Sequence, residues 1–194
     1  QSIEDLAIFR TLPNVVVMHP CDDVSTRVLT MQLPALGTPS YMRTARNKTP
    51  VLYDGREDEI KIGKGIVLTE GNDVAIVACG VLVSESLKAA ESLKAEGIHA
   101  TVVDMHTLKP IDGELIDTIA ARCGALVTAE DHNVIGGLGS AVAEHLVANI
   151  FAPLEMVGVP DRFGESGQAD EMLEVMQISA HYIALAAKKA ISRK

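Results

Sequence analysis

The chain has 194 residues, of which 47% are hydrophobic, and a formal net charge of -9 at pH 7. This length suits one large domain, or one domain with part of another, and the apolar content is enough for a buried core. The acidic balance argues against a nucleic acid partner, and no apolar run approaches bilayer length, so we expect no membrane contact and a cytoplasmic location. Aromatic residues make up only 3%, so aliphatic side chains must fill the core, as in parallel sheets covered by helices.

The chain opens as a short α/β piece, followed by a linker at 47–71. Apolar side chains of residues 3–9 recur on one helical face, with Ser2 as the expected N-cap. Further along, we expect a strand at 14–18, a helix at 22–33 and a strand at 40–43. In the linker, Ile60 and Ile62 alternate with charged residues between Pro and Gly punctuation, which predicts a small hairpin. The helical face at 3–9 is so apolar that it must pack against another part of the protein.

From residue 72 onward, strands and helices alternate regularly. We expect strands at 74–79, 101–103, 125–128 and 154–159, and helices at 83–96, 111–122, 140–150, 169–176 and 179–191. Gly97 is the expected C′ residue of the first of these helices, and Ser140 is the expected N-cap of the third. This βαβαβαβ order predicts an α/β domain, a mostly parallel sheet with helices on both faces, preceded by a partial α/β domain.

Polar side chains follow three of the predicted strands: Asp104, His106, Glu130, Asp131, His132 and Asp161. One interpretation is a binding edge with acid–base groups, because ligands favour the carboxyl ends of parallel strands. The other, which we favour, is that strand ends are polar simply because they meet solvent. A metal site at 130–132 is disfavoured, because neighbouring strand residues point to opposite faces of a sheet.

A glycine-rich loop at 136–140 leads from a predicted strand into a helix. The amides of a helix N-terminus can hold a phosphate, so a weak nucleotide site is one interpretation. The order G-G-x-G is not a dinucleotide fingerprint, however, and we favour close packing of the helix as the reason for these glycines. The single histidines of the chain are each interpreted as surface or satisfied core residues: His19, His99, His145 and His181.

The main basic cluster of this acidic chain consists of Arg43, Arg46 and Lys48, at the end of a predicted strand. A guanidinium group suits a phosphate or a carboxylate, because its planar fork offers paired donors. The alternative is a solvated loop with surface ion pairs. From the residues alone, the two interpretations stay open.

Several stretches together resemble one family. In chain order they are QSIEDLAIFRTLPNVVVMHPCD, PSYMRTAR, VDMHTLKPID, TAEDHNVIGGLGSAV and GVPDRFGESG. They resemble the C-terminal half of transketolase over essentially the whole chain. Deoxyxylulose-phosphate synthase and the β chains of 2-oxo acid dehydrogenases share parts of the pattern, whereas HTLKPID and DRFGESG favour transketolase, especially its short or split forms.

The resemblance implies a division of the chain into three parts. Residues 1–46 match the tail of the pyrimidine-binding domain, 47–71 a linker, and 72–194 the transketolase C-terminal domain. Transketolase transfers a two-carbon ketol unit from a ketose phosphate to an aldose phosphate, with thiamine diphosphate and Mg²⁺ as cofactors. The family's cofactor-holding segments have no counterpart here, so we expect the chain alone to be inactive and to bind neither. Its expected partners are a second copy in a homodimer, an N-terminal portion or subunit, and sugar phosphates.

The resemblance also assigns site residues. Arg46 matches the arginine that binds the substrate phosphate in transketolases and the synthases, and Arg43 matches a neighbouring arginine of the synthases. Gln1 and Glu4 match the flank of a family histidine that would precede Gln1, so both are expected near the active site. None of these matches a catalytic residue or a metal ligand of the family.

Alternatives to an enzyme part stay open. The chain could be a non-catalytic dimerisation or docking module, whose apolar face at 3–9 is covered by a partner. It could also be a weak nucleotide binder that uses the loop at 136–140. Because the family's strand edge in this domain is not where the thiamine lies, Glu130 and His132 are kept only as weak candidates for an effector or interface site.

Overall fold

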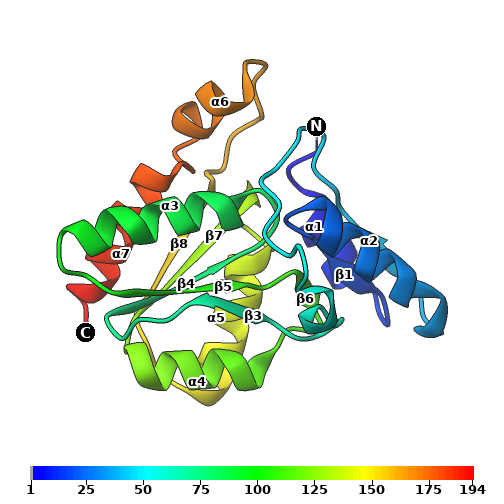
Figure 1. Ribbon diagram of the computed structural model, residues 1–194, viewed down its shortest axis with the longest axis horizontal. Coiled ribbons are helices and arrows are strands. Elements are labelled where there is room, and N and C mark those ends of the chain that lie inside the picture. The colour runs from blue at the N-terminus through cyan, green and yellow to red at the C-terminus, as the bar shows by residue number, and fades with distance from the viewer. Residues whose placement is uncertain (1) are drawn as a thin grey trace.

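The computed structural model describes residues 2–194, so Gln1 lies outside the described residues. Residues 2–194 form two β-sheets, and the larger has the strand order β3-β5-β4-β7-β8 (Figure 1). These strands are β3 (Ile66–Thr69), β4 (Val74–Ala78), β5 (Ala100–Asp104), β7 (Leu126–Asn133) and β8 (Leu154–Val159). All are parallel except β3, which pairs antiparallel with β5 at one edge. This arrangement confirms the predicted α/β fold with a mostly parallel sheet.

Helices cover both faces of the larger sheet (Figure 1). One face carries α3 (Leu82–Ala95) and α7 (Ala180–Ile191), and the other carries α4 (Gly113–Cys123) and α5 (Leu138–Asn149). Side chains of β4 alternate between the two cores, with Ile76 under α3 and α7, and Ala75 and Val77 under α4 and α5. The short helix α6 (Ala169–Val175) projects beyond these layers. No helix within residues 2–194 combines the length and apolarity needed to cross a membrane.

The smaller sheet joins the N-terminal piece to the rest of the chain. Its order is β2-β1-β6, formed by β1 (Val16–Met18), β2 (Ser40–Met42) and β6 (Thr107–Lys109). β1 and β2 are parallel, and β6 pairs antiparallel with β1. Two helices, α1 (Asp5–Thr11) and α2 (Asp23–Gln32), accompany this sheet. The predicted strands at 14–18 and 40–43 and the helix at 22–33 are therefore confirmed, whereas β6 is an addition that the sequence pattern does not predict.

Local sequence signals explain where α2 begins and where α3 ends. The Asp22 carboxylate accepts a hydrogen bond of 2.7 Å from the Ser25 amide, and the Ser25 hydroxyl accepts one of 3.1 Å from the Asp22 amide, which is a capping box. Helix α3 ends at Ala95, and Gly97, its C′ residue, has a φ of +82°. The amide of the next residue, Ile98, donates to the Leu93 carbonyl at 3.0 Å, as in a Schellman motif. The predicted C′ glycine is therefore confirmed.

Two predicted N-caps are wrong. Glu4, not Ser2, occupies the cap position of α1, and the Ser2 hydroxyl donates to the Glu4 carboxylate at 3.1 Å instead. Gly137 precedes α5, which places Ser140 within the first turn of the helix. The Ser140 hydroxyl accepts from the Gly136 amide at 2.8 Å, so it orders the loop before the helix rather than the helix end itself.

The small hairpin predicted within 47–71 does not form. The stretch contains a 3₁₀ helix at Glu57–Glu59 and the strand β3, which pairs with β5 rather than within the stretch. Ile60 is buried in the core without belonging to a strand, so its alternation with charged neighbours does not come from strand pleating. The larger sheet therefore begins at Ile66, a few residues before the predicted boundary at 72.

Candidate functional site

The carboxyl ends of β1 and β2 lie against β7, and a network of charged side chains fills this junction. Arg43, the residue after β2, donates from Nη2 to the Asp131 carbonyl at 2.9 Å and to the Asp131 carboxylate at 3.1 Å. Its Nη1 lies 3.7 Å from Oδ1 of Asp5 on α1. The Arg43 side chain is only 13% exposed. We call Asp5, His19, Arg43 and Asp131 the junction network.

His19, the residue after β1, completes the network. Its Nε2 lies 2.8 Å from Oδ1 of Asp131, and its Nδ1 lies 3.0 Å from the Arg43 carbonyl oxygen. Both ring nitrogens face oxygen acceptors, so only the doubly protonated ring donates both hydrogen bonds. Burial would raise the pKa of Asp131, but the charges and hydrogen bonds of His19, followed by the charge of Arg43, hold it well below its usual value. The network thus joins the Arg43 guanidinium and the His19 ring to the carboxylates of Asp5 and Asp131.

Tyr41 on β2 ties the helix α1 to this network. Its hydroxyl donates to Oδ2 of Asp5 at 2.7 Å, and its ring stacks on Phe9 with a centroid separation of 3.8 Å. Burial and the bond to Asp5 raise the pKa of Tyr41 to about 12. The apolar face predicted at 3–9 is therefore packed within the chain, with Leu6 fully buried.

Arg46 lies three residues beyond Arg43, on the loop that follows β2. It is exposed, and its guanidinium takes part in none of the ion pairs formed within residues 2–194. Lys48 on the same loop is also exposed. The structure thus separates the two arginines of the basic cluster, because the guanidinium of Arg43 is held internally by carboxylates while that of Arg46 faces solvent.

Glu4 is exposed at the start of α1, and its carboxylate accepts from the Ile3 amide at 3.0 Å. Its predicted position near an active site stays a prediction, as does that of Gln1.

Glu130 is buried in β7 and serves the N-terminus of α5. Its carboxylate accepts hydrogen bonds from the amides of Leu138 at 2.7 Å and Gly139 at 2.8 Å. Burial raises the pKa of Glu130 to about 7, although these two amides oppose the rise. Because the chain's own carboxylate occupies the helix N-terminus, the nucleotide interpretation of the glycine-rich loop is not supported.

His132 fastens α1 to β7. Its Nδ1 donates to the Asn133 carbonyl at 2.7 Å, and its Nε2 accepts from the Ala7 amide at 3.3 Å. Burial lowers the pKa of His132, which favours this neutral ring. A Cβ at Gly136 would lie 2.6 Å from that of Ala7, and a Cβ at Gly137 would overlap Oε2 of Glu130. These contacts agree with the close-packing interpretation of the glycines.

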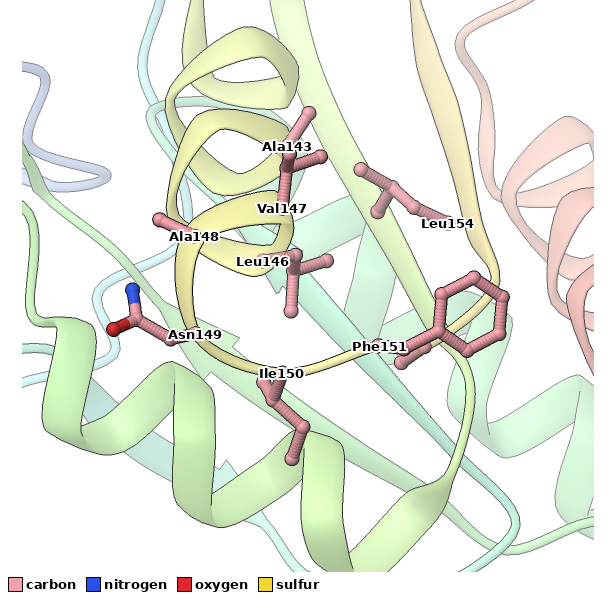
Figure 2. Close-up of a pocket in the computed structure, with 9 residues that line it drawn as sticks. Ala143, Leu146, Val147, Ala148, Asn149, Ile150, Phe151 and Leu154 are labelled. Atoms are coloured by element: carbon pink, nitrogen blue, oxygen red, sulfur yellow. The ribbon is translucent and has the colours of Figure 1, made fainter.

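An apolar groove of about 300 Å³ lies at the turn from α5 to β8 (Figure 2). Val147 and Phe151, two of its lining residues, are 91% and 94% exposed. The lining contains no titratable side chain, so this groove has no group for acid–base work or for binding a phosphate.

Comparison with known proteins decides the family. The family model described as "Transketolase, C-terminal domain" matches residues 63–183. The chain belongs to the transketolase C-terminal domain family. The chain is 44% identical over 193 residues to "6-deoxy-6-sulfo-D-fructose transketolase subunit SqwH" of a Clostridium species, covering 100% of this chain and 60% of that protein.

Other relatives agree. An apulose-4-phosphate transketolase subunit of Phocaeicola vulgatus is 36% identical over 181 residues, covering 93% of this chain and 56% of that protein. A solved structure described as "Split gene transketolase, inactive beta4 tetramer" has a TM-score of 0.95 and 45% identity, covering 99% of this chain and 63% of that one. The chain therefore spans roughly three fifths of the length of these relatives.

The strand-end residues of the chain are mostly buried, so the favoured interpretation that they meet solvent is wrong. Asp104 and His106 are fully buried, and Asp104 accepts hydrogen bonds from the Tyr53 hydroxyl at 2.8 Å and the Cys21 thiol at 3.4 Å. Burial raises the pKa of Asp104. Only Asp161 of the strand-end set is exposed. Within residues 2–194, no three His, Cys, Asp or Glu side chains gather in a way that could hold a metal ion.

The sequence does not show that the four residues of the junction network lie together. In the sequence, Asp131 is one of several strand-end residues, and His19 is an isolated histidine whose interpretation as a satisfied core residue is confirmed. Asp5 carries no signal beyond its place in a first helical turn. The available signal is that His19 and Arg43 each follow an apolar strand directly, which places both at carboxyl ends of neighbouring parallel strands.

Proposed function

We propose that this chain is the C-terminal section of a split transketolase. Together with an N-terminal section, it would transfer a two-carbon ketol unit from a ketose phosphate to an aldose phosphate. The observation that carries this proposal is the match, over nearly the whole chain, to proteins that are named as transketolase subunits and are longer than this chain. A 37% identity over 189 residues to "1-deoxy-D-xylulose-5-phosphate synthase" of Trichormus variabilis supports that synthase as the second candidate, although the match covers only 30% of that protein.

Arg46 would bind the terminal anionic group of the sugar. Its guanidinium is exposed and unpaired within the described part of the chain, and it follows the carboxyl end of β2, where ligands of parallel sheets commonly bind. Arg43, the second phosphate-binding candidate, matches a neighbouring arginine of the synthases, but its guanidinium already contacts Asp131 and faces Asp5. Of the two arginines, Arg46 is therefore the one whose guanidinium is free to bind a substrate phosphate.

The substrate class follows from what the relatives share. One relative is named for a sulfo-sugar and another for a sugar phosphate, so both names describe sugars with an anionic group. We infer that this chain also takes such a sugar, because a guanidinium fork binds phosphate and sulfonate oxygens by the same charge-assisted hydrogen bonds.

The cofactors would be held mainly outside this chain. When bound, thiamine diphosphate supplies the carbanion chemistry that ketol transfer needs. Residues 2–194 contain no cluster of three potential metal ligands, so they do not fit the Mg²⁺ that accompanies the diphosphate. This chain would contribute substrate binding through Arg46 and the edge of the site near Glu4.

The partners would be an N-terminal section and further copies of this chain. The similar structure is described as an inactive tetramer of one subunit type. We infer that the isolated chain likewise self-associates and has no ketol-transfer activity until the N-terminal section joins it.

An Arg46→Ala variant of the reconstituted enzyme tests this function. Loss of one charge-assisted contact costs about 1.5–3 kcal/mol, so KM for a phosphorylated sugar should rise about 10- to 150-fold. KM for an uncharged sugar should not change, and Lys48→Ala, which removes another exposed cation from the same loop, should leave both values near those of the wild type. An equal loss for charged and uncharged sugars in Arg46→Ala would refute the role of Arg46.

A further inference from the structure

The exposed loop at 44–48, which carries Arg46, follows a residue whose backbone and side chain both make hydrogen bonds. Arg43 is the last residue before the exposed stretch 44–48. Its carbonyl oxygen accepts from His19 at 3.0 Å, and its guanidinium donates to Asp131 at 2.9 and 3.1 Å. Its amide also donates to the Met18 carbonyl at 3.0 Å. Both the backbone and the side chain at the base of the loop are therefore fixed.

Asp131 is the centre of this arrangement. One carboxylate oxygen lies 2.8 Å from His19, and the other accepts from Arg43. His19 and Arg43 follow the two parallel strands of the smaller sheet, whereas Asp131 belongs to β7 of the larger sheet. The Asp131 carboxylate thus helps to set the position of the loop base relative to the larger sheet, together with the Asp131 carbonyl and the hydrogen bond of 3.0 Å from the Gly80 amide to the His19 carbonyl.

The energetics favour a positioning role over a purely stabilising one. Bringing the Arg43 guanidinium, the His19 ring and two carboxylates out of water is costly, and buried ion pairs often add little to stability relative to apolar residues. What such a network does provide is a fixed geometry at the groups that are hydrogen-bonded, here His19 and Arg43 on the two oxygens of the Asp131 carboxylate. A guanidinium that must meet a substrate anion in a fixed place depends on such geometry.

We propose that Asp131 is a positioning residue for substrate binding, which holds the loop at 44–48 through Arg43 and His19 so that Arg46 meets the anionic group of the sugar. This inference rests on the proposed function of Arg46. It assigns Arg43 to anchoring the loop rather than to contacting the phosphate.

The test uses Asp131→Asn in the chain reconstituted with its N-terminal section. The amide preserves the shape of the carboxylate but removes its charge and one acceptor. We expect KM for a phosphorylated sugar to rise about tenfold, with kcat within about twofold of the wild type and KM for an uncharged sugar unchanged. In the isolated chain, tryptic cleavage after Arg46 and Lys48, followed by mass spectrometry, should become about tenfold faster as the loop is released.

Glu155→Gln is the matched control. Glu155 is also a partly buried carboxylate of the larger sheet that contacts two cations, Lys189 at 2.8 Å and Arg193, but both partners lie on or beside α7. It should change neither KM nor cleavage at 44–48. If Asp131→Asn does not fold, His19→Gln replaces it, because this variant loosens the Arg43 carbonyl while keeping the pair between Arg43 and Asp131.

The outcomes separate this inference from the proposed function. A rise in both KM and loop cleavage supports it. The positioning role of Asp131 is overturned if Arg46→Ala raises KM for phosphorylated sugars but a folded Asp131→Asn enzyme keeps the wild-type KM. This holds whether or not cleavage of the loop becomes faster. If Arg46→Ala itself leaves that KM unchanged, the proposed function fails, and the positioning role fails with it.

Discussion

The buried Glu130 makes stability depend on pH in a direction that can be measured. Burial places the pKa of Glu130 at about 7, above the 4.5 of a free glutamate. The folded state therefore holds this proton more tightly than the unfolded chain does. The resulting contribution to stability is fully present below pH 4.5 and is lost as the pH rises through 7. The substitution Glu130→Gln removes the titration while keeping the size of the side chain.

The size of the effect follows from the two pKa values. Each tenfold difference in proton affinity is worth about 1.4 kcal/mol, so the contribution lost between pH 4.5 and pH 8 is about 3 kcal/mol. Other buried groups also make stability depend on pH, among them His106 and His132, whose pKa values are lowered by burial. The difference between wild type and variant removes the contribution of His106 and leaves that of Glu130, together with any change in His132, whose Nδ1 lies 3.7 Å from Oε2 of Glu130.

Urea unfolding followed by circular dichroism, at several pH values and one protein concentration, measures this difference. The free energy of unfolding of the wild type should fall by about 3 kcal/mol relative to Glu130→Gln as the pH rises from 4.5 to 8. Glu91→Gln, which changes an exposed glutamate on α3 that takes part in no ion pair within residues 2–194, should give a curve parallel to the wild type. If the Glu130→Gln curve is also parallel to the wild type, the burial argument is wrong.

Two further predictions concern stability. Gly80→Ala should lower the free energy of unfolding in urea by more than about 3 kcal/mol, because the φ of Gly80 is +57° and the new Cβ would overlap the His19 ring. The control Gly97→Ala also has a positive φ, +82°, but no neighbour within 4 Å, so it should cost only about 1–2 kcal/mol. Equal costs for the two variants would contradict the overlap with His19. Tyr53→Phe should cost about 1–3 kcal/mol because it removes the hydroxyl donor to the buried Asp104, and a cost near zero would contradict that assignment.

The larger sheet is predictable because each central strand carries its own signal. Val74–Ala78 is apolar at every position since both of its faces are buried, and the intervening helices show their period clearly. The right-handed βαβ rule then leaves few arrangements for such an order.

The strands β3 and β6 are not predictable from local pattern. β6 has three residues, and its partner β1 lies some 90 residues earlier in the chain. β3 pairs antiparallel with β5, which follows it beyond a further strand and helix. Alternation of apolar and charged residues indicates a strand but does not show which other strand it pairs with. Alternation within the linker therefore suggests pairing inside the linker, as a hairpin, rather than with β5.

Of the candidate site, Arg46 can be predicted from the sequence, but the junction network cannot. Arg46 comes from the resemblance to a family, and the structure leaves its guanidinium free among the described residues. The contacts of Asp131 have no local signal in the sequence, because His19 lies 112 positions away and Arg43 lies 88 away. The sequence pattern predicts that the strand-end residues are exposed to solvent, because it does not show that the N-terminal piece covers them. In the structure this piece does cover His132, whose ring accepts a hydrogen bond from the Ala7 amide.

The central claim is that this chain needs a second polypeptide section to perform ketol transfer. The most direct measurement mixes it with the N-terminal section, thiamine diphosphate and Mg²⁺, and follows transfer from a ketose phosphate to an aldose phosphate. We predict no turnover from either section alone and turnover from the mixture, strongly reduced for phosphorylated sugars by Arg46→Ala. Turnover by this chain alone, or a folded and associated mixture with no turnover, would contradict the claim.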